Sequence, residues 1–338
     1  MTTTTSAVPA QRRLGKAGPA VFPLSLGCMG MSGMYGAADE AESIATIQAA
    51  LDAGVTLLDT GDFYGSGHNE MLIARALAGR RERVLLSVKV GALRTPDGGW
   101  GGFDARPIAI RNFAAYSLKR LKVEHIDIYR PARLDPQVPI EDVIGAMAEL
   151  VKAGYVRYIG LSEVGAATIR RAHAVHPICD LQIEYSLLSR APERAIFPVL
   201  QQLGIGITAY GILSRGLIGG SRPGQAGDLR AHLPRFSADN LQRNLVLLAP
   251  LQQLAAEKGL PVAQLAIAWV LAQTPSMIAV IGARTRSQLA QSLAATQLQL
   301  SAVELQRIGT AVPAGAVAGE RYGEQQMRML DSERGDSA

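Results

Sequence analysis

The sequence predicts an α/β fold, a parallel (β/α)8 barrel of the TIM type with an N-terminal hairpin and extra helices. Short β-rich apolar runs alternate with longer amphipathic segments from one end of the 338-residue chain to the other. Eight apolar runs can be distinguished, and helical segments separate them. Hydrophobic residues make up 48% of the chain, which is enough to bury a core of barrel size.

The predicted strands cover residues 24–30, 56–60, 84–91, 126–132, 156–162, 181–187, 206–212 and 278–283. Helices are expected between them, for example over 40–54 and 139–154. The second of these has proline at its start, acids in its first turn and glycine at its end. A doubly wound sheet is the alternative, but it requires a glycine-rich dinucleotide turn after the first strand, and "GCMGMSG" has the wrong spacing.

Two segments interrupt the alternation. Residues 11–27 predict a small hairpin ahead of the first strand, and residues 214–239, rich in glycine, proline and arginine, predict a flap over a ligand. We expect residues 1–11 to form a flexible arm, 12–323 a single barrel domain and 324–338 a C-terminal tail. Arg321 and Tyr322 raise the question of whether the end of the chain returns to the barrel mouth.

Composition argues against several classes of protein. The net charge of +5 comes from basic residues dispersed among acids, which fits an anionic cofactor better than nucleic acid. No apolar run approaches the length of a membrane span. Cys28 and Cys179 form neither a disulfide framework nor a metal site, so we expect no metal and a cytoplasmic location. The partner is expected to be a small molecule, and the oligomeric state is not readable.

Chemistry in such a barrel belongs at the carboxyl ends of the strands, where Asp59, Tyr64 and Lys89 lie. Lys89 sits between Val88 and Val90, and burial of its ammonium group would require a partner such as Asp59. A buried ammonium near a phenol lowers the phenol pKa from about 10. We therefore predict that Tyr64 donates a proton to a developing alkoxide near neutral pH.

Four stretches resemble the aldo-keto reductase family: "LLDTGDFYGSGHNEMLIARAL", "GYVRYIGLSE", "LQIEYSLLSR" and "IAVIGARTRSQLAQSLAA". They occur in the family's order, and the resemblance extends over residues 12–322. It implies a barrel that binds NADP(H) in extended form without a Rossmann domain and reduces carbonyls by hydride transfer. By this resemblance Tyr64 is the acid, Lys89 tunes it and Asp59 holds Lys89.

The resemblance also implies a cofactor site. Ser162, Glu163 and Gln182 match positions that bind the nicotinamide carboxamide, although many members have asparagine at the position of Glu163. Tyr210 matches the aromatic residue that stacks on the nicotinamide ring. The pyrophosphate loop and the neighbouring strand ends add Gly27, Met29, Gly211, Ile212, Leu213, Ser214, Arg215, Gly216, Gly282 and Ala283, with Gly211 and Ile212 replacing the family's usual serine-proline pair.

The stretch "GARTRSQLAQS" follows the last strand and opens a helix, where backbone amides favour a phosphate. The family pattern makes Arg284 the contact to the 2′-phosphate, and the arginine fork suits that group. Preference for NADP over NAD rests on this residue. Gln288, Gln291 and Ser292 match adenosine contacts, although the family commonly ends this motif in glutamate and asparagine. A solvated helix face is the alternative interpretation.

The family's fourth catalytic residue, a histidine after the fourth strand, aligns with Ala132. The chain could be an inactive NADP(H)-binding sensor or partner subunit, or a reductase of another bond such as an activated carbon-carbon double bond. We favour a carbonyl reductase or alcohol dehydrogenase in which substrate or water fills the gap. Strand periodicity turns Arg130 inward, either to the substrate or to a salt bridge lower in the barrel.

The substrate is suggested by "PDGGWGGFDARP" and "YRPARLDP", which resemble a bacterial and fungal group that includes pyridoxal reductases, also described as pyridoxine 4-dehydrogenases. Trp100 and Phe103 could stack on a flat aromatic ring, which suits a pyridine aldehyde. Packing of Trp100 as a loop anchor is the equal alternative. His68 follows Tyr64 by four residues and is expected to cap the second helix.

Overall fold

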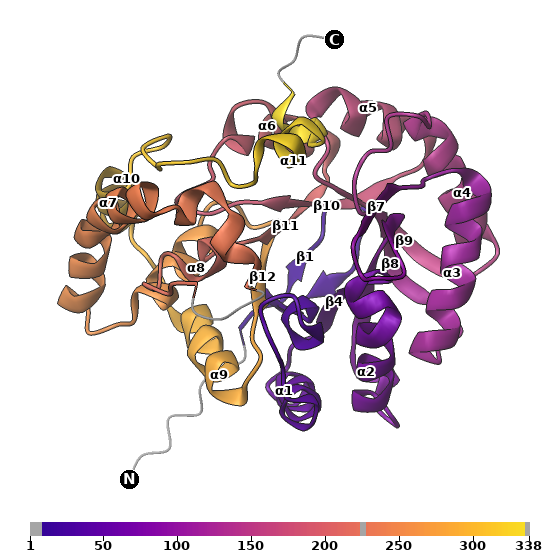
Figure 1. Ribbon diagram of the computed structural model, residues 1–338, viewed down its shortest axis with the longest axis horizontal. Coiled ribbons are helices and arrows are strands. Elements are labelled where there is room, and N and C mark those ends of the chain that lie inside the picture. Colours follow the sequence, from indigo (N-terminus) through magenta and orange to yellow (C-terminus); the bar gives the residue numbers. More distant parts are fainter. Residues whose placement is uncertain (1–8, 224–227, 335–338) are drawn as a thin grey trace.

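The computed structural model describes residues 9–223 and 228–334. Eight parallel strands close into a barrel in the order β10-β11-β12-β3-β4-β5-β8-β9 (Figure 1), which confirms the predicted fold. Each predicted strand is present. The strands are β3 (Leu24–Gly27), β4 (Leu57–Gly61), β5 (Leu85–Val90), β8 (Ile126–Pro131), β9 (Val156–Ser162), β10 (Ile178–Glu184), β11 (Gly206–Tyr210) and β12 (Met277–Gly282).

Helices surround the barrel (Figure 1). The capping signals of the predicted 139–154 helix are observed, with Pro139 as N-cap and Glu141 and Asp142 in the first turn. The helices are α1 (Glu40–Asp52), α2 (His68–Ala76), α3 (Pro107–Leu121), α4 (Ile140–Lys152), α5 (Ala166–Val175), α6 (Pro192–Leu203), α7 (Ala238–Glu257), α8 (Val262–Leu271), α9 (Arg286–Ala294), α10 (Ala302–Ala311) and α11 (Glu324–Arg328).

No single helix in the described part of the chain is long and apolar enough to cross a bilayer. The bent pair of α7 and α8 passes the same test together, by length and composition only, with a bend of 94° between its halves. In α8 the residues from Leu265 to Leu271 are all buried, as expected of a helix in the protein core.

The predicted N-terminal hairpin is present and closes the bottom of the barrel. Strands β1 (Arg12–Arg13) and β2 (Ala20–Val21) pair in antiparallel fashion. Leu14 and Val21 are completely buried and form a small separate cluster with Leu57, Ile128, Cys179 and Ile278. Because this end is plugged by apolar side chains, the site must lie at the opposite mouth, where the parallel strands end.

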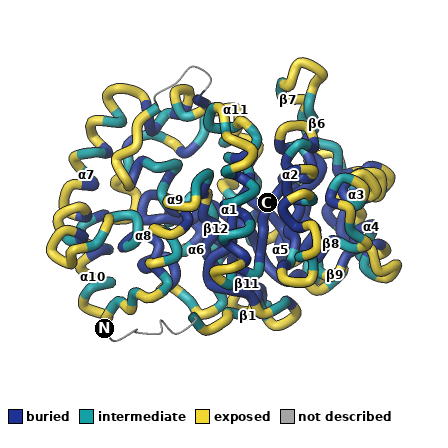
Figure 2. The backbone as a smooth tube through the Cα atoms, turned by 90° about the horizontal axis from the view of Figure 1, so that it is seen from below, coloured by how far each residue is buried: buried dark blue, intermediate teal, exposed yellow. Residues whose placement is uncertain are grey.

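Loops and the end of the chain shape that mouth. A second hairpin, β6 (Ala92–Arg94) with β7 (Trp100–Phe103), stands out from the body of the molecule and is largely exposed at its tip (Figure 2). The predicted flap contains the 3-10 turns η4 (Ser214–Gly216), η5 (Leu229–His232) and η6 (Pro234–Phe236), and residues 224–227 of it lie outside the described residues. Phe236 is buried in the core, so η6 is packed against the barrel.

The C-terminal segment crosses from α10 to α11 (Figure 1). The predicted tail is described up to residue 334, and it docks on the barrel at its turn η8 (Asp331–Glu333). The amide of Ser332 donates to the Glu163 carbonyl at 3.3 Å, and the amide of Gly165 donates to the Asp331 carboxylate at 2.8 Å. Residues 1–8 of the expected arm and the last four residues of the tail lie outside the described residues.

The contact between hairpin and barrel can be tested at Gly206. A Cβ atom there would lie 2.7 Å from the backbone nitrogen of Gly15, where neither backbone can give way. We expect Gly206→Ala to lower the free energy of unfolding by about 1–3 kcal/mol. The control is Gly145→Ala in α4, where a Cβ meets open space and should stabilise the protein by about 0.5–1 kcal/mol. Urea unfolding measures both, and equal effects would contradict the proposed contact.

Candidate active site

The centre of the site is an ion pair between two adjacent strands. Residues Asp59 and Ser87 are paired in the register of β4 and β5, and Lys89 lies two residues further along. The Lys89 ammonium donates to Oδ1 of Asp59, so the predicted pairing is confirmed. Ser87 Oγ and Gln182 Nε2 donate to Oδ2 of the same carboxylate at 2.9 and 2.8 Å. Both charges are almost completely buried, and burial lowers the pKa of Lys89 against the opposing effect of Asp59.

Tyr64 lies at the start of a short turn after β4 and is 6% exposed. The Lys89 ammonium is 5.2 Å from the centre of its ring. We predicted that the ammonium lowers the phenol pKa, and the structure shows the opposite direction. Burial, followed by the Asp59 carboxylate, raises the pKa of Tyr64 well above 10. Since Asp59 already offsets the Lys89 charge, the phenol keeps its proton at neutral pH, which is the form that a proton donor requires.

Ala132 follows β8 beside this centre. Its amide donates to the Val90 carbonyl at 2.7 Å, and its side chain is 2% exposed. A methyl group provides neither a hydrogen-bond donor nor a titratable group at this position.

Arg130 lies inside the barrel with its side chain completely buried. Its guanidinium donates to Asp180 at 3.1 Å, to the Leu161 carbonyl at 3.2 Å and to Ser87 Oγ at 3.2 Å. The prediction that Arg130 contacts the substrate is therefore wrong, and the alternative, a salt bridge lower in the barrel, is correct. Strand periodicity predicted the inward direction but could not predict the partner on β10.

Arg133 is a cation that the sequence reasoning missed. It is half-buried, and its Nη1 atom donates to the neighbouring Ala132 carbonyl at 2.6 Å. Its positive charge opposes the burial that raises the pKa of Tyr64, and it adds to burial in lowering the pKa of Lys89 and to Arg321 in lowering the pKa of Glu163. Within the described part of the chain Arg133 forms no ion pair. The signal was present in "RPARLDP", where Arg133 directly follows Ala132.

The residues expected at the nicotinamide separate into two kinds. Ser162 Oγ is buried at the end of β9 without a hydrogen-bond partner among residues 9–223 and 228–334, so it could bind a polar ligand group. Glu163, in contrast, already accepts hydrogen bonds from five donors and is completely buried. Its predicted role as a carboxamide ligand does not fit this arrangement, because a carboxylate has about four lone-pair sites.

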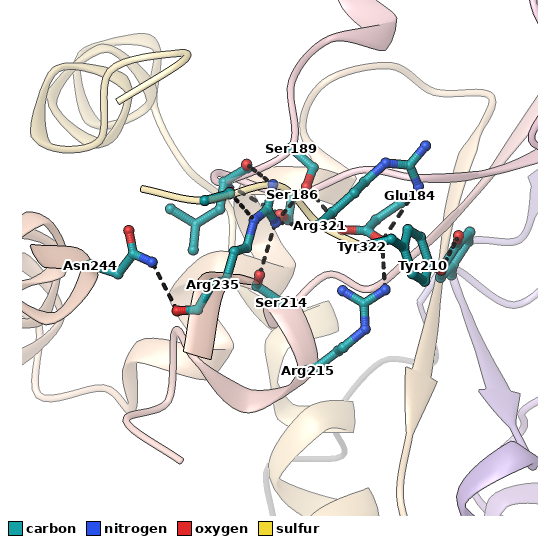
Figure 3. A network of polar contacts seen from close by, with 12 residues as sticks. Glu184, Ser186, Ser189, Tyr210, Ser214, Arg215, Arg235, Asn244, Arg321 and Tyr322 are labelled. Atoms are coloured by element: carbon teal, nitrogen blue, oxygen red, sulfur yellow. Dashed lines mark hydrogen bonds and ion pairs between the residues drawn. The ribbon is translucent and has the colours of Figure 1, made fainter. Parts of the chain in front are cut away.

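Tyr210 and the loop after it are held in place by the buried carboxylates of Glu163 and Glu184. The Tyr210 hydroxyl donates to Glu163 Oε1 at 2.8 Å. Four residues of the following segment have positive φ, namely Gly211 (67°), Ser214 (47°), Arg215 (57°) and Gly216 (92°). Arg215 pairs with Glu184 at 3.1 Å, and Figure 3 shows both beside Tyr210 and Tyr322. Ile212 is buried and Leu213 packs against the core, so the segment forms a tight, anchored turn.

The predicted adenosine end lies where β12 leads into α9. Arg284 is half-buried, and in the described part of the chain its side chain donates to two backbone carbonyls, those of Tyr35 at 3.2 Å and Ala37 at 3.3 Å. The Arg284 amide donates to Gln288 Oε1 at 2.9 Å. On α9, Gln291 is exposed and Ser292 is half-buried. At the end of β12, Ala283 is buried, and a Cβ on Gly282 would meet open space. Met29 begins a short turn after β3, and a Cβ on Gly27 would lie 2.9 Å from the Val280 side chain.

An aromatic series leads from Tyr64 to the projecting hairpin. Phe63 makes edge contacts with Tyr64 at 4.8 Å and with Trp100 at 6.4 Å between ring centres. Trp100 also contacts Phe103 at 5.2 Å and is 49% exposed. The Arg94 guanidinium also lies over the indole, 5.5 Å from the ring centre, so the ring is packed on several sides and about half exposed.

The expectation that His68 caps the second helix is wrong, because His68 is the first residue of α2 and Gly67 is its N-cap, without a side-chain cap. His68 Nδ1 instead lies within hydrogen-bond distance of Ser32 Oγ at 3.0 Å.

Residues 23–312 match the Aldo/keto reductase family. The chain belongs to this family. It is 41% identical over 318 residues to probable aldo-keto reductase 1 of Glycine max, covering 92% of this chain and 91% of that protein.

Three solved structures give the same answer. The glycerol dehydrogenase of Gluconobacter oxydans has a TM-score of 0.81 and 27% identity over 98% of this chain and 99% of its own. An aldo-keto reductase of Bacillus halodurans in its holo form has a TM-score of 0.74 and 30% identity over 92% and 98%. A Klebsiella pneumoniae enzyme, solved with NADP and acetate, has a TM-score of 0.72 and 26% identity over 93% and 99%.

Within this aldo-keto reductase the structure adds residues that sequence reasoning passed over. Ser87 donates a hydrogen bond to Asp59. The buried carboxylate of Glu184 forms ion pairs with Arg215, Arg235 and Arg321. Their signal was weak, because a serine or glutamate inside a strand is common. No group of three or more His, Cys, Asp or Glu side chains suited to a metal ion occurs among residues 9–223 and 228–334.

The buried pair gives the first prediction for the site. Lys89→Met should leave the Asp59 carboxylate buried without its cation and lower the free energy of unfolding by about 3–5 kcal/mol. Adding Asp59→Asn should recover part of that loss. The matched surface pair is Lys258 with Glu304, where Lys258→Met should change stability by less than about 1 kcal/mol. Similar losses in the two single variants, measured by urea unfolding, would argue against a special cost at Lys89.

Proposed function

We propose that this aldo-keto reductase is an NADP(H)-dependent oxidoreductase that interconverts an aldehyde or ketone and its alcohol. The observation that carries the proposal is the buried pair of Asp59 and Lys89 under a Tyr64 phenol that keeps its proton. Burial of two charges lowers stability, and such pairs cluster at functional sites. A role in proton transfer at the barrel mouth therefore explains why the pair is present. Relatives solved in a holo form and with NADP support the cofactor.

The described residues fit NADP(H). Ser162 Oγ is a buried polar atom without a partner at the expected nicotinamide position, and Tyr210 supplies the ring beside it. The turn over 211–216 would hold the pyrophosphate, and Arg284 has no carboxylate partner that would compete with a phosphate. When bound, the cofactor supplies or accepts the hydride at the carbonyl carbon.

Tyr64 would then donate its proton to the carbonyl oxygen as the carbon gains hydride, so that the alcohol leaves neutral. The phenolate that remains is stabilised by the Lys89 ammonium and by the charge of Arg133. In the reverse direction the phenolate takes the alcohol proton. Arg133 thereby supplies the positive charge that is missing at Ala132, although it does not replace the histidine hydrogen bond.

We propose that the substrate is an aromatic aldehyde such as pyridoxal and that the enzyme acts in the cytoplasm. The half-exposed indole of Trp100 offers an aromatic surface at the end of the series of rings that leads to Tyr64. The methyl group of Ala132 leaves room beside the phenol for a substrate larger than a simple aldehyde. A polar group on the substrate could also face Arg133, which is unpaired within the described chain.

Tyr64→Phe tests the mechanism. We expect NADPH-dependent reduction of aromatic aldehydes, pyridoxal included, to fall by about a hundredfold to ten-thousandfold because the proton donor is lost. NADPH affinity should stay within a fewfold of that of the unmodified protein, since the substitution removes only the hydroxyl oxygen and leaves the ring. The measurements are NADPH absorbance for turnover and intrinsic fluorescence for binding. Turnover that survives in the variant would refute Tyr64 as the acid.

Arg284→Met tests the cofactor assignment. Loss of a charge-assisted contact to the 2′-phosphate should weaken NADPH binding by about tenfold to hundredfold and leave NADH binding little changed. Arg286→Met is the matched control, because Arg286 lies in the first turn of α9 and is exposed in a pair with Glu42. An equal loss for both cofactors in the Arg284 variant would contradict a phosphate contact.

Ala132 supports a second candidate, a non-catalytic NADP(H)-binding sensor or partner subunit. Its side chain supplies no proton and no hydrogen bond where the family has histidine. The same aldehyde panel separates the two functions. Tight NADPH binding by the unmodified protein, with no turnover on any aldehyde, ketone or alcohol, would favour the sensor.

A further inference from the structure

The C-terminal segment 321–333 enters the barrel mouth at the strand ends expected to hold the nicotinamide. Arg321 is 5% exposed and donates through both terminal nitrogens to Glu163, at 3.0 Å to Oε1 and 2.5 Å to Oε2. Ser332 Oγ adds a further bond to Oε2 at 2.8 Å. Tyr322 places its hydroxyl 3.2 Å from the hydroxyl of Tyr210. One short segment therefore contacts the ends of both β9 and β11.

The middle strand, β10, is bound as well. Arg321 lies 3.5 Å from Oε2 of Glu184, and Arg215 approaches the same oxygen at 3.1 Å (Figure 3). The Tyr322 ring lies against both guanidinium groups, with its centre 4.6 Å from Arg215 and 5.4 Å from Arg321. Tyr322 thus connects the C-terminal segment to the turn expected to hold the pyrophosphate.

Charge balance explains why this contact is stable. Glu163 and Glu184 are both completely buried, and each would be costly to ionise without a cation. Burial opposes ionisation of Glu163, but the Arg321 guanidinium overcomes this effect and holds its pKa at about 2. A charged Glu163 accepts the Tyr210 hydroxyl and the Glu184 amide, which fixes the stacking tyrosine from behind.

We infer that residues 321–333 form a clasp that positions the nicotinamide half of the cofactor site. Arg321 acts through Glu163 on Tyr210, and Tyr322 acts on Tyr210 directly, so both are positioning residues that need not touch the cofactor. Ser162 Oγ, the neighbour of Glu163 that has no partner, is left to bind the ligand. The clasp rests on the proposed function, because it presupposes that the chain binds NADP(H).

Arg321→Gln tests the clasp. We expect NADPH to bind about tenfold to hundredfold more weakly and to dissociate faster, because a buried Glu163 carboxylate without its cation no longer holds Tyr210. Affinity for 2′,5′-ADP, which carries the 2′-phosphate but no nicotinamide, should stay within about threefold, since Arg284 donates to the carbonyls of Tyr35 and Ala37 and shares no hydrogen bond with Arg321 or Glu163 among the described residues. General unfolding would weaken both ligands. Fluorescence titration gives the affinities and stopped flow gives the rate of NADPH release.

Two further variants separate the charge pair of Arg321 with Glu163 from the packing of the Arg321 side chain. Adding Glu163→Gln to Arg321→Gln removes both charges and should recover most of the NADPH affinity. Arg321→Lys keeps a cation but loses the two-pronged contact, and it should show an intermediate loss even if Arg321→Gln folds poorly. The control is Arg328→Gln on α11, where the side chain is exposed and pairs only with Glu324, and it should behave as the unmodified protein.

The outcomes distinguish the clasp from the function on which it rests. An unmodified protein that binds neither NADPH nor 2′,5′-ADP would overturn both. Normal binding by the unmodified protein, with unchanged NADPH affinity and release in Arg321→Gln, would overturn the clasp and leave the proposed function intact. Tighter NADPH binding in Arg321→Gln would also overturn it, because the segment would then be an obstacle to the cofactor.

Discussion

The organisation of the barrel interior depends on the ion pair of Lys89 with Asp59. An ammonium group in a strand between two buried valines is stable only if a carboxylate from the adjacent strand meets it. That requirement determines what surrounds the pair, because the second oxygen of Asp59 must also be satisfied, and Ser87 and Gln182 do so. Residues from two other strands, β5 and β10, are therefore committed to the one carboxylate of Asp59.

The same requirement recurs below and above this pair. Below it, Arg130 is neutralised by Asp180 and shares Ser87 with the central pair, so the two polar layers are linked by one hydroxyl group. Above it, Glu163 and Glu184 are neutralised by arginines from the C-terminal segment and from the turn after β11. The inside of the barrel is thus apolar at its bottom, where the N-terminal hairpin closes it, and polar nearer the mouth. Its mouth is preorganised by charge rather than by apolar packing.

Local sequence patterns were sufficient for the barrel and for the residues at its strand ends. Strand alternation and helix stop signals located all eight strands, and parallel topology brings their carboxyl ends together at one mouth. The pairing of Lys89 with Asp59 followed from the cost of burying a lone ammonium. Arg130 shows where such reasoning ends, since a period of two gives the direction of a side chain but not the residue it meets.

By itself, the sequence determined the order of the strands along the chain and the end of the barrel at which we expect the site. Only the tertiary structure decided that Glu163 is bound by Arg321, which lies 158 residues further along the chain, and that Arg130 pairs with Asp180. It also reversed the expected pKa shift of Tyr64. The reason is physical: periodicity is a local property, whereas burial and the distances between charges depend on how remote segments pack.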